Sequence, residues 1–224
     1  MKSLTLLLAF TALYTPILNA QDFKFDGDTM TVVFESGLDK KNLHSAVFAS
    51  VANIYNSAND VVQMNNAAAG KIIVKGTSEV ALEDPNKITE PKNDLIPRYI
   101  EYNVKHTLNI DIKDNKYRLR LNVGEKYLYY LGQKFTHTKI SVPWLTFETP
   151  SDAETQDYVE KIKKSYAESR WTKGLLKKKK HIAYFDAIPS IWKQNVGEFR
   201  QMAKDIAVRI NTSVVNASGQ DDDW

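Results

Sequence analysis

Alternation of apolar and polar residues over positions 98–132 constrains the fold more than any other feature of this sequence. The alternation forms two runs, separated by the turn-forming stretch Lys-Asp-Asn-Lys at 113–116. The apolar positions are Tyr102, Val104, Leu108, Ile110 and Ile112 in the first run, and Tyr117, Leu119, Leu121 and Val123 in the second. A period of two is typical of strands with one buried and one solvated face. The segment therefore predicts a long antiparallel hairpin.

Other segments predict the elements that accompany this hairpin. Residues 22–36 and 60–66 are rich in β-branched and apolar residues, which predicts strands. Asp39 is placed as the N-cap of an amphipathic helix that ends near Tyr55. Ser151 and Glu154 fit a capping box before a helix over about 152–169, and apolar periodicity predicts a last helix over about 189–211. The order predicts an α+β fold, an antiparallel sheet with helices packed on one face.

The Gly-Lys pair at Gly70 and Lys71 raises the question of a phosphate-binding loop. Ile72 stands where such a loop needs Ser or Thr, and Asn65 stands where its first glycine would be. We therefore interpret Gly70 as a turn residue with positive φ, followed by a strand. Gly76, inside this strand, predicts a bulge or a close approach of another group.

The first 20 residues have the three parts of a secretory signal. A basic start with Lys2 precedes an apolar stretch, and Ala20 offers a small residue for cleavage before Gln21. Cleavage there would reduce the net charge from +3 to +2, which predicts no strong attraction to nucleic acid. The sequence has no cysteine, which excludes disulfides, thiolate nucleophiles and cysteine-ligated metals. No later segment is apolar enough to span a membrane.

Several of these features together resemble a known family. They are the exported start, the helix that ends in Ile54-Tyr55, the segment Gly-Lys-Ile-Ile-Val-Lys-Gly at 70–76, and the hairpin around residues 108–121. The chain resembles, over about residues 23–130, an exported Bacteroidetes family of unknown function with a TATA-binding-protein-like fold. The resemblance implies a fold and a compartment, but no activity.

The expected organisation has four parts. Residues 1–20 form the signal peptide and 21–130 the TATA-binding-protein-like α+β domain. Residues 131–211 form a C-terminal extension with two helices, joined by a basic linker at 171–189, and 212–224 form a disordered acidic tail. The sequence does not place residues 134–187 within the fold.

The sequence has no motif that identifies a catalytic, cofactor-binding or metal-binding residue. The histidines His44, His106, His137 and His181 do not have the spacing of metal ligands. No serine lies in a nucleophile motif, and an acid pair such as Asp111 with Asp114 cannot be assigned to glycoside hydrolysis without its geometry. We therefore expect no cofactor.

Two groups of residues form a candidate binding patch. Tyr127 and Tyr129 are the tyrosines of the hairpin that could face outward, where they would suit contact with a partner. The basic run Lys177, Lys178, Lys179 and Lys180 could contact an anionic surface weakly or could be a solvated linker, and we favour the linker.

These observations lead to an expected function and one alternative. We expect an exported, non-enzymatic binding module of the bacterial cell envelope, in the periplasm or outside the cell. Its partner would be a protein or an envelope component, and not nucleic acid. The alternative is a periplasmic hydrolase or a small-ligand-binding protein whose site is assembled from residues distant in the sequence.

Overall fold

The computed structural model describes residues 22–55, 61–130, 133–137, 143–169, 172, 175 and 178–218. Its strands are β1 Lys24–Asp26, β2 Thr29–Glu35, β3 Val62–Asn66, β4 Lys71–Glu83, β5 Tyr99–Lys113, β6 Lys116–Tyr130 and β7 Gln133–His137. Its helices are α1 Lys40–Ile54, the short α3 Asn86–Thr89, α4 Asp152–Glu168 and α5 Lys179–Ser218. The predicted signal segment 1–20 lies outside the described residues.

The strands form one antiparallel sheet of seven strands, in the order β1-β2-β6-β5-β4-β3, with β7 paired to β6. The predicted hairpin is its centre, because β5 and β6 pair along most of their length and Asn115 closes the turn with a φ of 61°. The segment 22–36, which was predicted as one strand, is two strands. Gly27 has a φ of 55° and turns the chain between them, because glycine adopts positive φ at little cost.

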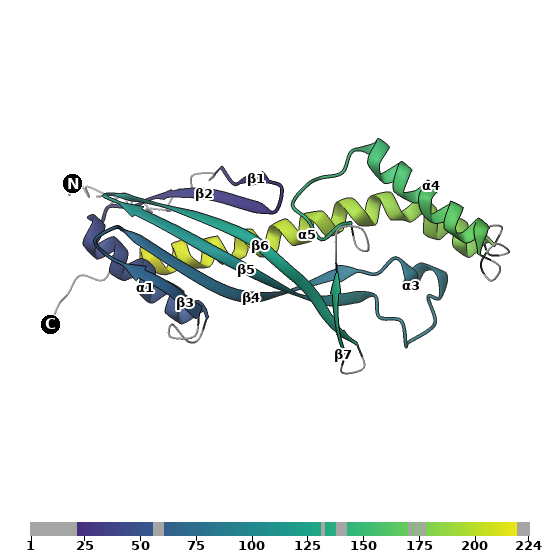
Figure 1. The fold of residues 1–224 in the computed structure, drawn as a ribbon, viewed down its shortest axis with the longest axis horizontal. Helices are drawn as coiled ribbons and strands as arrows, with labels where there is room; N and C mark the ends of the chain where they lie inside the picture. Colours follow the sequence, from purple (N-terminus) through teal and green to yellow (C-terminus); the bar gives the residue numbers. More distant parts are fainter. Residues whose placement is uncertain are drawn as a thin grey trace, which may run out of the picture.

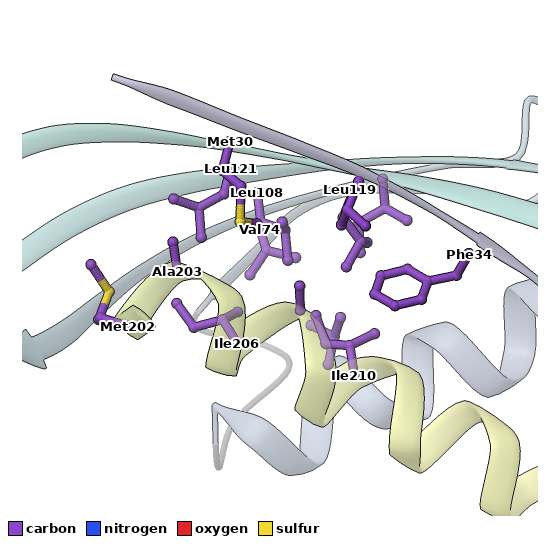
Figure 2. Packing of buried hydrophobic residues seen from close by; sticks show 14 of the residues in the cluster. Met30, Phe34, Val74, Leu108, Leu119, Leu121, Met202, Ala203, Ile206 and Ile210 are labelled. Carbon is purple, nitrogen blue, oxygen red and sulfur yellow. The ribbon is translucent and has the colours of Figure 1, made fainter. Parts of the chain in front are cut away.

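Two helices, α1 and α5, cover one face of this sheet (Figure 1). The side chain of Asp39 accepts a hydrogen bond from the Asn42 N–H, which confirms it as the N-cap of α1. The apolar residues of both helices meet the inward residues of the strands in one core, and Figure 2 shows Ala203, Ile206 and Ile210 pointing toward Val74, Leu108, Leu119 and Phe34. This arrangement confirms the predicted sheet with helices on one face.

Helix α5 is longer at both ends than its prediction of 189–211. Its first turns belong to the segment 171–189, so the predicted linker is wrong from Lys179 onward. An interior proline costs a helix about 3 kcal/mol, but Pro189 lies between buried residues, Ile188 and Ile191, whose packing holds the helix together. At the other end Val214 is buried in the core, so residues 212–218, placed in the disordered tail, continue the helix.

The start of α5 packs against α4 and forms a second, smaller apolar cluster. Its buried members are Val159 of α4 and Tyr184, Phe185 and Ile188 of α5. The predicted capping box of α4 is confirmed, since Ser151 and Glu154 exchange both of its hydrogen bonds. These two helices are the predicted helical extension, and α5 continues from it into the core beneath the sheet (Figure 1). Whether 21–130 is a separate domain stays a prediction.

None of the helices in the described part of the chain is long and apolar enough to cross a membrane.

Candidate functional site

Strand β4 has an edge that β3 covers only at its beginning. β3 pairs with β4 from Lys71 to Val74, whereas β5 pairs with β4 over all 13 residues. Among the described residues, no strand pairs with the second edge of β4 beyond Val74. A row of unpaired N–H and C=O groups at an edge is a template for an additional strand.

The hydrogen bonds of Glu83 show which residues of β4 direct their backbone groups to this edge. The Glu83 N–H donates to Oδ1 of Asn195 on α5 at 2.8 Å, and the Glu83 carbonyl accepts from Nδ2 of the same side chain at 2.9 Å. Both groups therefore point away from β5. The pairing of β4 with β5 has no register shift, and backbone direction alternates along a strand. Thr77, Glu79 and Ala81 therefore present their N–H and C=O groups at the same edge.

A groove with a volume of about 840 Å³ lies along this edge, between β4 and α5. Its apolar lining comes mainly from Val80 on β4, Ile54 at the end of α1, and Met202 and Ile206 on α5. We call it the edge groove. Ser78, the inward residue of β4 before Val80, is small and lines the groove, so it leaves space under the strand.

Charged side chains line the two sides of the edge groove. Glu79 lies on the strand side, Glu198 and Asp205 lie on the helix side, and Arg209 is the one cation among its lining residues. All four side chains are exposed. Asp205 accepts a hydrogen bond from Gln201 at 2.7 Å, and this neutral partner leaves the negative charge in place. The edge groove is therefore predominantly acidic at neutral pH.

Tyr55, a half-buried residue that lines the edge groove, forms a hydrogen-bonded pair with the buried His106. Their Oη and Nε2 atoms are 2.7 Å apart, and Nδ1 of His106 lies 3.3 Å from the Val104 carbonyl. With the proton on Nδ1, the imidazole donates to this carbonyl and accepts from the tyrosine. Burial lowers the pKa of the His106 imidazole, and the carbonyl bond opposes this. Burial also raises the pKa of the Tyr55 hydroxyl, against the nearby Arg209 charge.

The predicted close approach of another group to Gly76 is confirmed, and the approaching groups are the side chains of Tyr55 and His106. A Cβ atom at this position would lie 2.4 Å from Cε1 of Tyr55 and 2.9 Å from Nε2 of His106. The tyrosine ring therefore occupies the space that a larger residue would take. The alternative prediction of a bulge at Gly76 is wrong, because β4 pairs with β5 there in regular register.

Of the two tyrosines in the predicted aromatic patch, the structure describes the side chain of Tyr127, and two lysines lie near its ring. Nζ of Lys134 lies 4.1 Å from the centre of the Tyr127 ring, and Nζ of Lys105 lies 5.8 Å from it. Both lysines form ion pairs with Glu125, and their hydrogen bonds lower the pKa of this carboxyl to about 2. The side chain of Tyr129 lies outside the described residues. Tyr127 is thus half-buried beneath lysines and not an open stacking surface.

The basic run lies at a different place from these tyrosines. Lys177 is outside the described residues, Lys178 and Lys179 are exposed, and Lys180 forms an ion pair with Glu90 beside α3. Figure 1 shows the start of α5 near the end of α4, apart from the β6–β7 hairpin. The structure therefore does not bring the two halves of the candidate patch together.

The acid pair that was considered in the sequence, Asp111 and Asp114, makes contacts within the fold. Asp111 forms an ion pair with Arg118 across the hairpin, and Asp114 accepts from the backbone N–H of Lys40. The side chain of His137 lies outside the described residues. Within the described ranges, no three His, Asp or Glu side chains gather as metal ligands would.

Of the residues named from the sequence as a binding patch, Tyr127 lines the edge groove. The groove itself was not predicted, although two signals for it are present. Gly76 and Ser78 interrupt the large inward residues of β4, and this marks a space beneath the strand. On α5, Glu198, Gln201 and Asp205 recur at helical spacing and form a polar stripe beside the apolar one. Neither signal shows by itself that the two elements face each other.

Comparison with known proteins finds a matching family model and similar solved structures. Residues 30–123 match the family model described as a domain of unknown function (DUF4468) with TBP-like fold. A TBP-like protein from Parabacteroides distasonis is similar in structure, with a TM-score of 0.50, 13% sequence identity, and coverage of 84% of this chain and 92% of that chain. A DUF4468 family protein from Bacteroides ovatus has a TM-score of 0.43 and 11% identity, with coverage of 88% of each chain.

No curated protein matches the chain. At these identities the structural similarity shows the fold alone, and the printed descriptions of both structures name no ligand. The family model falls within residues 23–130, which are the residues that carry the resemblance in the sequence. Residues 30–123 of this chain therefore belong to the family described as a domain of unknown function (DUF4468) with TBP-like fold.

Proposed function

We propose that this protein is an exported, non-enzymatic binding module of the bacterial cell envelope, and that it binds another protein at the edge groove. The observation that carries the proposal is the groove itself, which lies beside an edge of β4 that no described strand covers. Exposed strand edges are liabilities that proteins usually shorten or cover, so a long one beside a groove favours a binding role.

The lining of the edge groove supports a protein partner. Apolar side chains such as Val80 and Met202 lie beside ionised ones such as Glu198 and Asp205. A protein surface can meet both kinds of group at once, since interfaces combine an apolar centre with a polar rim. Export is the second part of the proposal and depends on the signal pattern of residues 1–20.

A crosslinked pull-down from native envelope tests the proposal. Wild-type protein is compared with Gln201→Trp, which places an indole over the edge groove from an exposed position of α5. Val208→Trp is the matched control, because Val208 is also exposed on α5 but does not line the groove. We expect the same partner on wild type and control, and its loss on Gln201→Trp. A partner that all three baits capture equally would contradict the edge groove as the binding site.

A further inference from the structure

We propose that the edge groove takes an extended polypeptide segment of the partner as an additional strand on β4, and that this segment carries Lys or Arg side chains. The inference rests on the proposed function and adds the mode of binding and the chemistry of the bound segment. The backbone of β4, the two ends of its open edge and the charges around the groove support it.

The backbone of β4 offers a regular row of donors and acceptors. Thr77, Glu79 and Ala81 direct their N–H and C=O groups to the open edge, as the bonds of Glu83 to Asn195 show. Residues two apart in a strand are about 6.7 Å apart, which is the repeat that a neighbouring strand presents. An extended segment can therefore bond to all three residues without rearrangement of β4.

The two ends of the open edge limit the length of the added strand. Asn195 already bonds to both backbone groups of Glu83, in the way that a strand residue would. At the other end, β3 pairs with Val74. Between these limits, at 3.3–3.4 Å per residue, there is room for a segment of about six residues.

The side chains around the edge groove set the chemistry of the segment. Alternate residues of an added strand would face the apolar lining, which includes Val80, Met202 and Ile206. Among the lining residues, the charged groups are the carboxylates Glu79, Glu198 and Asp205 and one cation, Arg209. The excess of carboxylates favours basic side chains and disfavours acidic ones. The segment that fits best therefore alternates apolar with basic residues.

The same charges argue against a second copy of this chain as the occupant. An antiparallel pairing of two β4 edges about a two-fold axis would centre on Glu79, the middle of its three outward residues. Two Glu79 side chains would then stand opposite each other, and like charges directly opposite are destabilising. The acidic residues of both grooves would also lie near one another.

Peptide binding, measured by fluorescence anisotropy on the full chain, tests the inference. The basic probe is fluorescein-labelled Lys-Val-Lys-Val-Lys-Val-Lys, and the acidic probe has Glu in place of every Lys. Two further probes carry N-methyl groups on the Val amides or on the interior Lys amides. Because alternate residues of a strand point to opposite edges, each methylated probe loses the hydrogen-bond donors of one edge only.

We expect the basic probe to bind more tightly than the acidic one, and only one methylated probe to lose affinity. The loss of two or three backbone hydrogen bonds, according to which probe is affected, corresponds to a decrease of about ten-fold or more, whereas methylation of the other edge should change the affinity by less than about three-fold. Attraction between charges alone would leave both methylated probes equal to the basic probe, and that result would overturn the inference.

Charge reversal gives a second, independent readout. Glu79→Lys combined with Asp205→Lys should reverse the preference toward the acidic probe, while Glu35→Lys, at an exposed position of β2, should leave it unchanged. Failure of the basic probe to bind, or a preference that the double variant does not alter, would overturn the inference. Concentration-dependent self-association that Glu79→Lys strengthens would identify a second copy as the occupant instead. Even if one of these results overturned the strand-addition inference, a partner that is captured in the pull-down and lost on Gln201→Trp would still support the proposed function.

Discussion

Asn195 of α5 pairs with the backbone of Glu83 as a neighbouring strand would, with one bond of 2.8 Å to the N–H and one of 2.9 Å from its amide to the carbonyl. The side chain of Asn195 is completely buried. This pair links the middle of α5 to the end of β4 and closes the open edge at one end.

Asn195→Ala should therefore be strongly destabilising. The substitution removes both hydrogen bonds and leaves the backbone groups of Glu83 without these partners, which predicts a loss of about 2–4 kcal/mol in the free energy of unfolding. Urea denaturation measures it. Gln194→Ala, at the exposed neighbouring position, is the control and should change the free energy of unfolding by less than about 0.5 kcal/mol. Equal effects of the two variants would show that the Asn195 bonds contribute nothing.

Substitutions at Gly27 and Gly70 allow the stability cost of backbone strain to be distinguished from that of a steric conflict. Gly70 and Gly27 have φ values of 65° and 55°, a conformation that costs other residues about 1–2 kcal/mol. A Cβ at Gly70 would also lie 2.3 Å from the Ile112 carbonyl oxygen, whereas nothing lies within 4 Å of one at Gly27.

Gly70→Ala should therefore lower the free energy of unfolding by clearly more than Gly27→Ala. We expect about 1 kcal/mol for Gly27→Ala and about 3 kcal/mol for Gly70→Ala, because the second substitution also forces the turn away from β5. Thermal and urea unfolding of both variants measure the difference. Gly70→Ala with wild-type stability would contradict the turn geometry.

Local signals in the sequence were sufficient to predict most of the strands of the sheet. The alternation that ends at Ile112 and resumes at Tyr117 predicts β5 and β6 because each inward residue contributes to one core face. Asp39 and Ser151 predict the starts of α1 and α4 because capping depends on neighbouring residues only.

The long helix and the edge groove could not be predicted in the same way. Pro189 disfavours a helix locally, and the packing of Tyr184 and Phe185 on α4 stabilises the first part of α5 in spite of it. The edge groove depends on where β3 ends and on which helix faces β4. These contacts join residues far apart in the chain, and periodicity does not report them.

The export proposal predicts the N-terminus of the mature protein. If residues 1–20 are removed, the protein recovered from the envelope or medium should begin at Gln21. Intact-mass analysis of protein isolated from cells gives the result directly. An Ala20→Arg variant should accumulate uncleaved, because signal cleavage needs a small residue at this place. A cell-associated form that retains Met1 in the wild type would contradict the proposal.

The basic run at the start of α5 should not act as a membrane anchor. Of its described members, Lys180 already pairs with Glu90, and exposed ion pairs of this kind contribute little to stability. Changing Lys177, Lys178, Lys179 and Lys180 to glutamine should therefore leave both the fold and the binding to anionic liposomes unaltered. Co-sedimentation at low and high salt measures this, because salt shortens the Debye length from about 10 Å at 0.1 M to about 3 Å at 1 M. Salt-sensitive binding that the variant loses would contradict this expectation.

The hydrogen-bonded pair of Tyr55 and the buried His106 predicts how stability depends on pH. Burial lowers the pKa of folded His106 from the 6.5 of an unperturbed histidine. Below about pH 6.5 the unfolded chain therefore binds a proton that the folded chain does not, and stability must fall as the pH decreases. Protonation would also place a donor at Nε2, where the imidazole with its proton on Nδ1 accepts from Tyr55. His44 and His181 also have lowered pKa values and contribute in the same direction.

Urea unfolding at several pH values between about 7.5 and 5.5 tests this assignment. In the wild type the free energy of unfolding should be constant at the upper end and should decrease toward the lower end. His106→Gln should lose part of this decrease, because glutamine does not titrate, and His44→Gln and His181→Gln measure the parts due to the other two histidines. If His106→Gln kept the full wild-type decrease, the imidazole would bind protons equally in the folded and unfolded chains, and the lowered pKa of folded His106 would be contradicted.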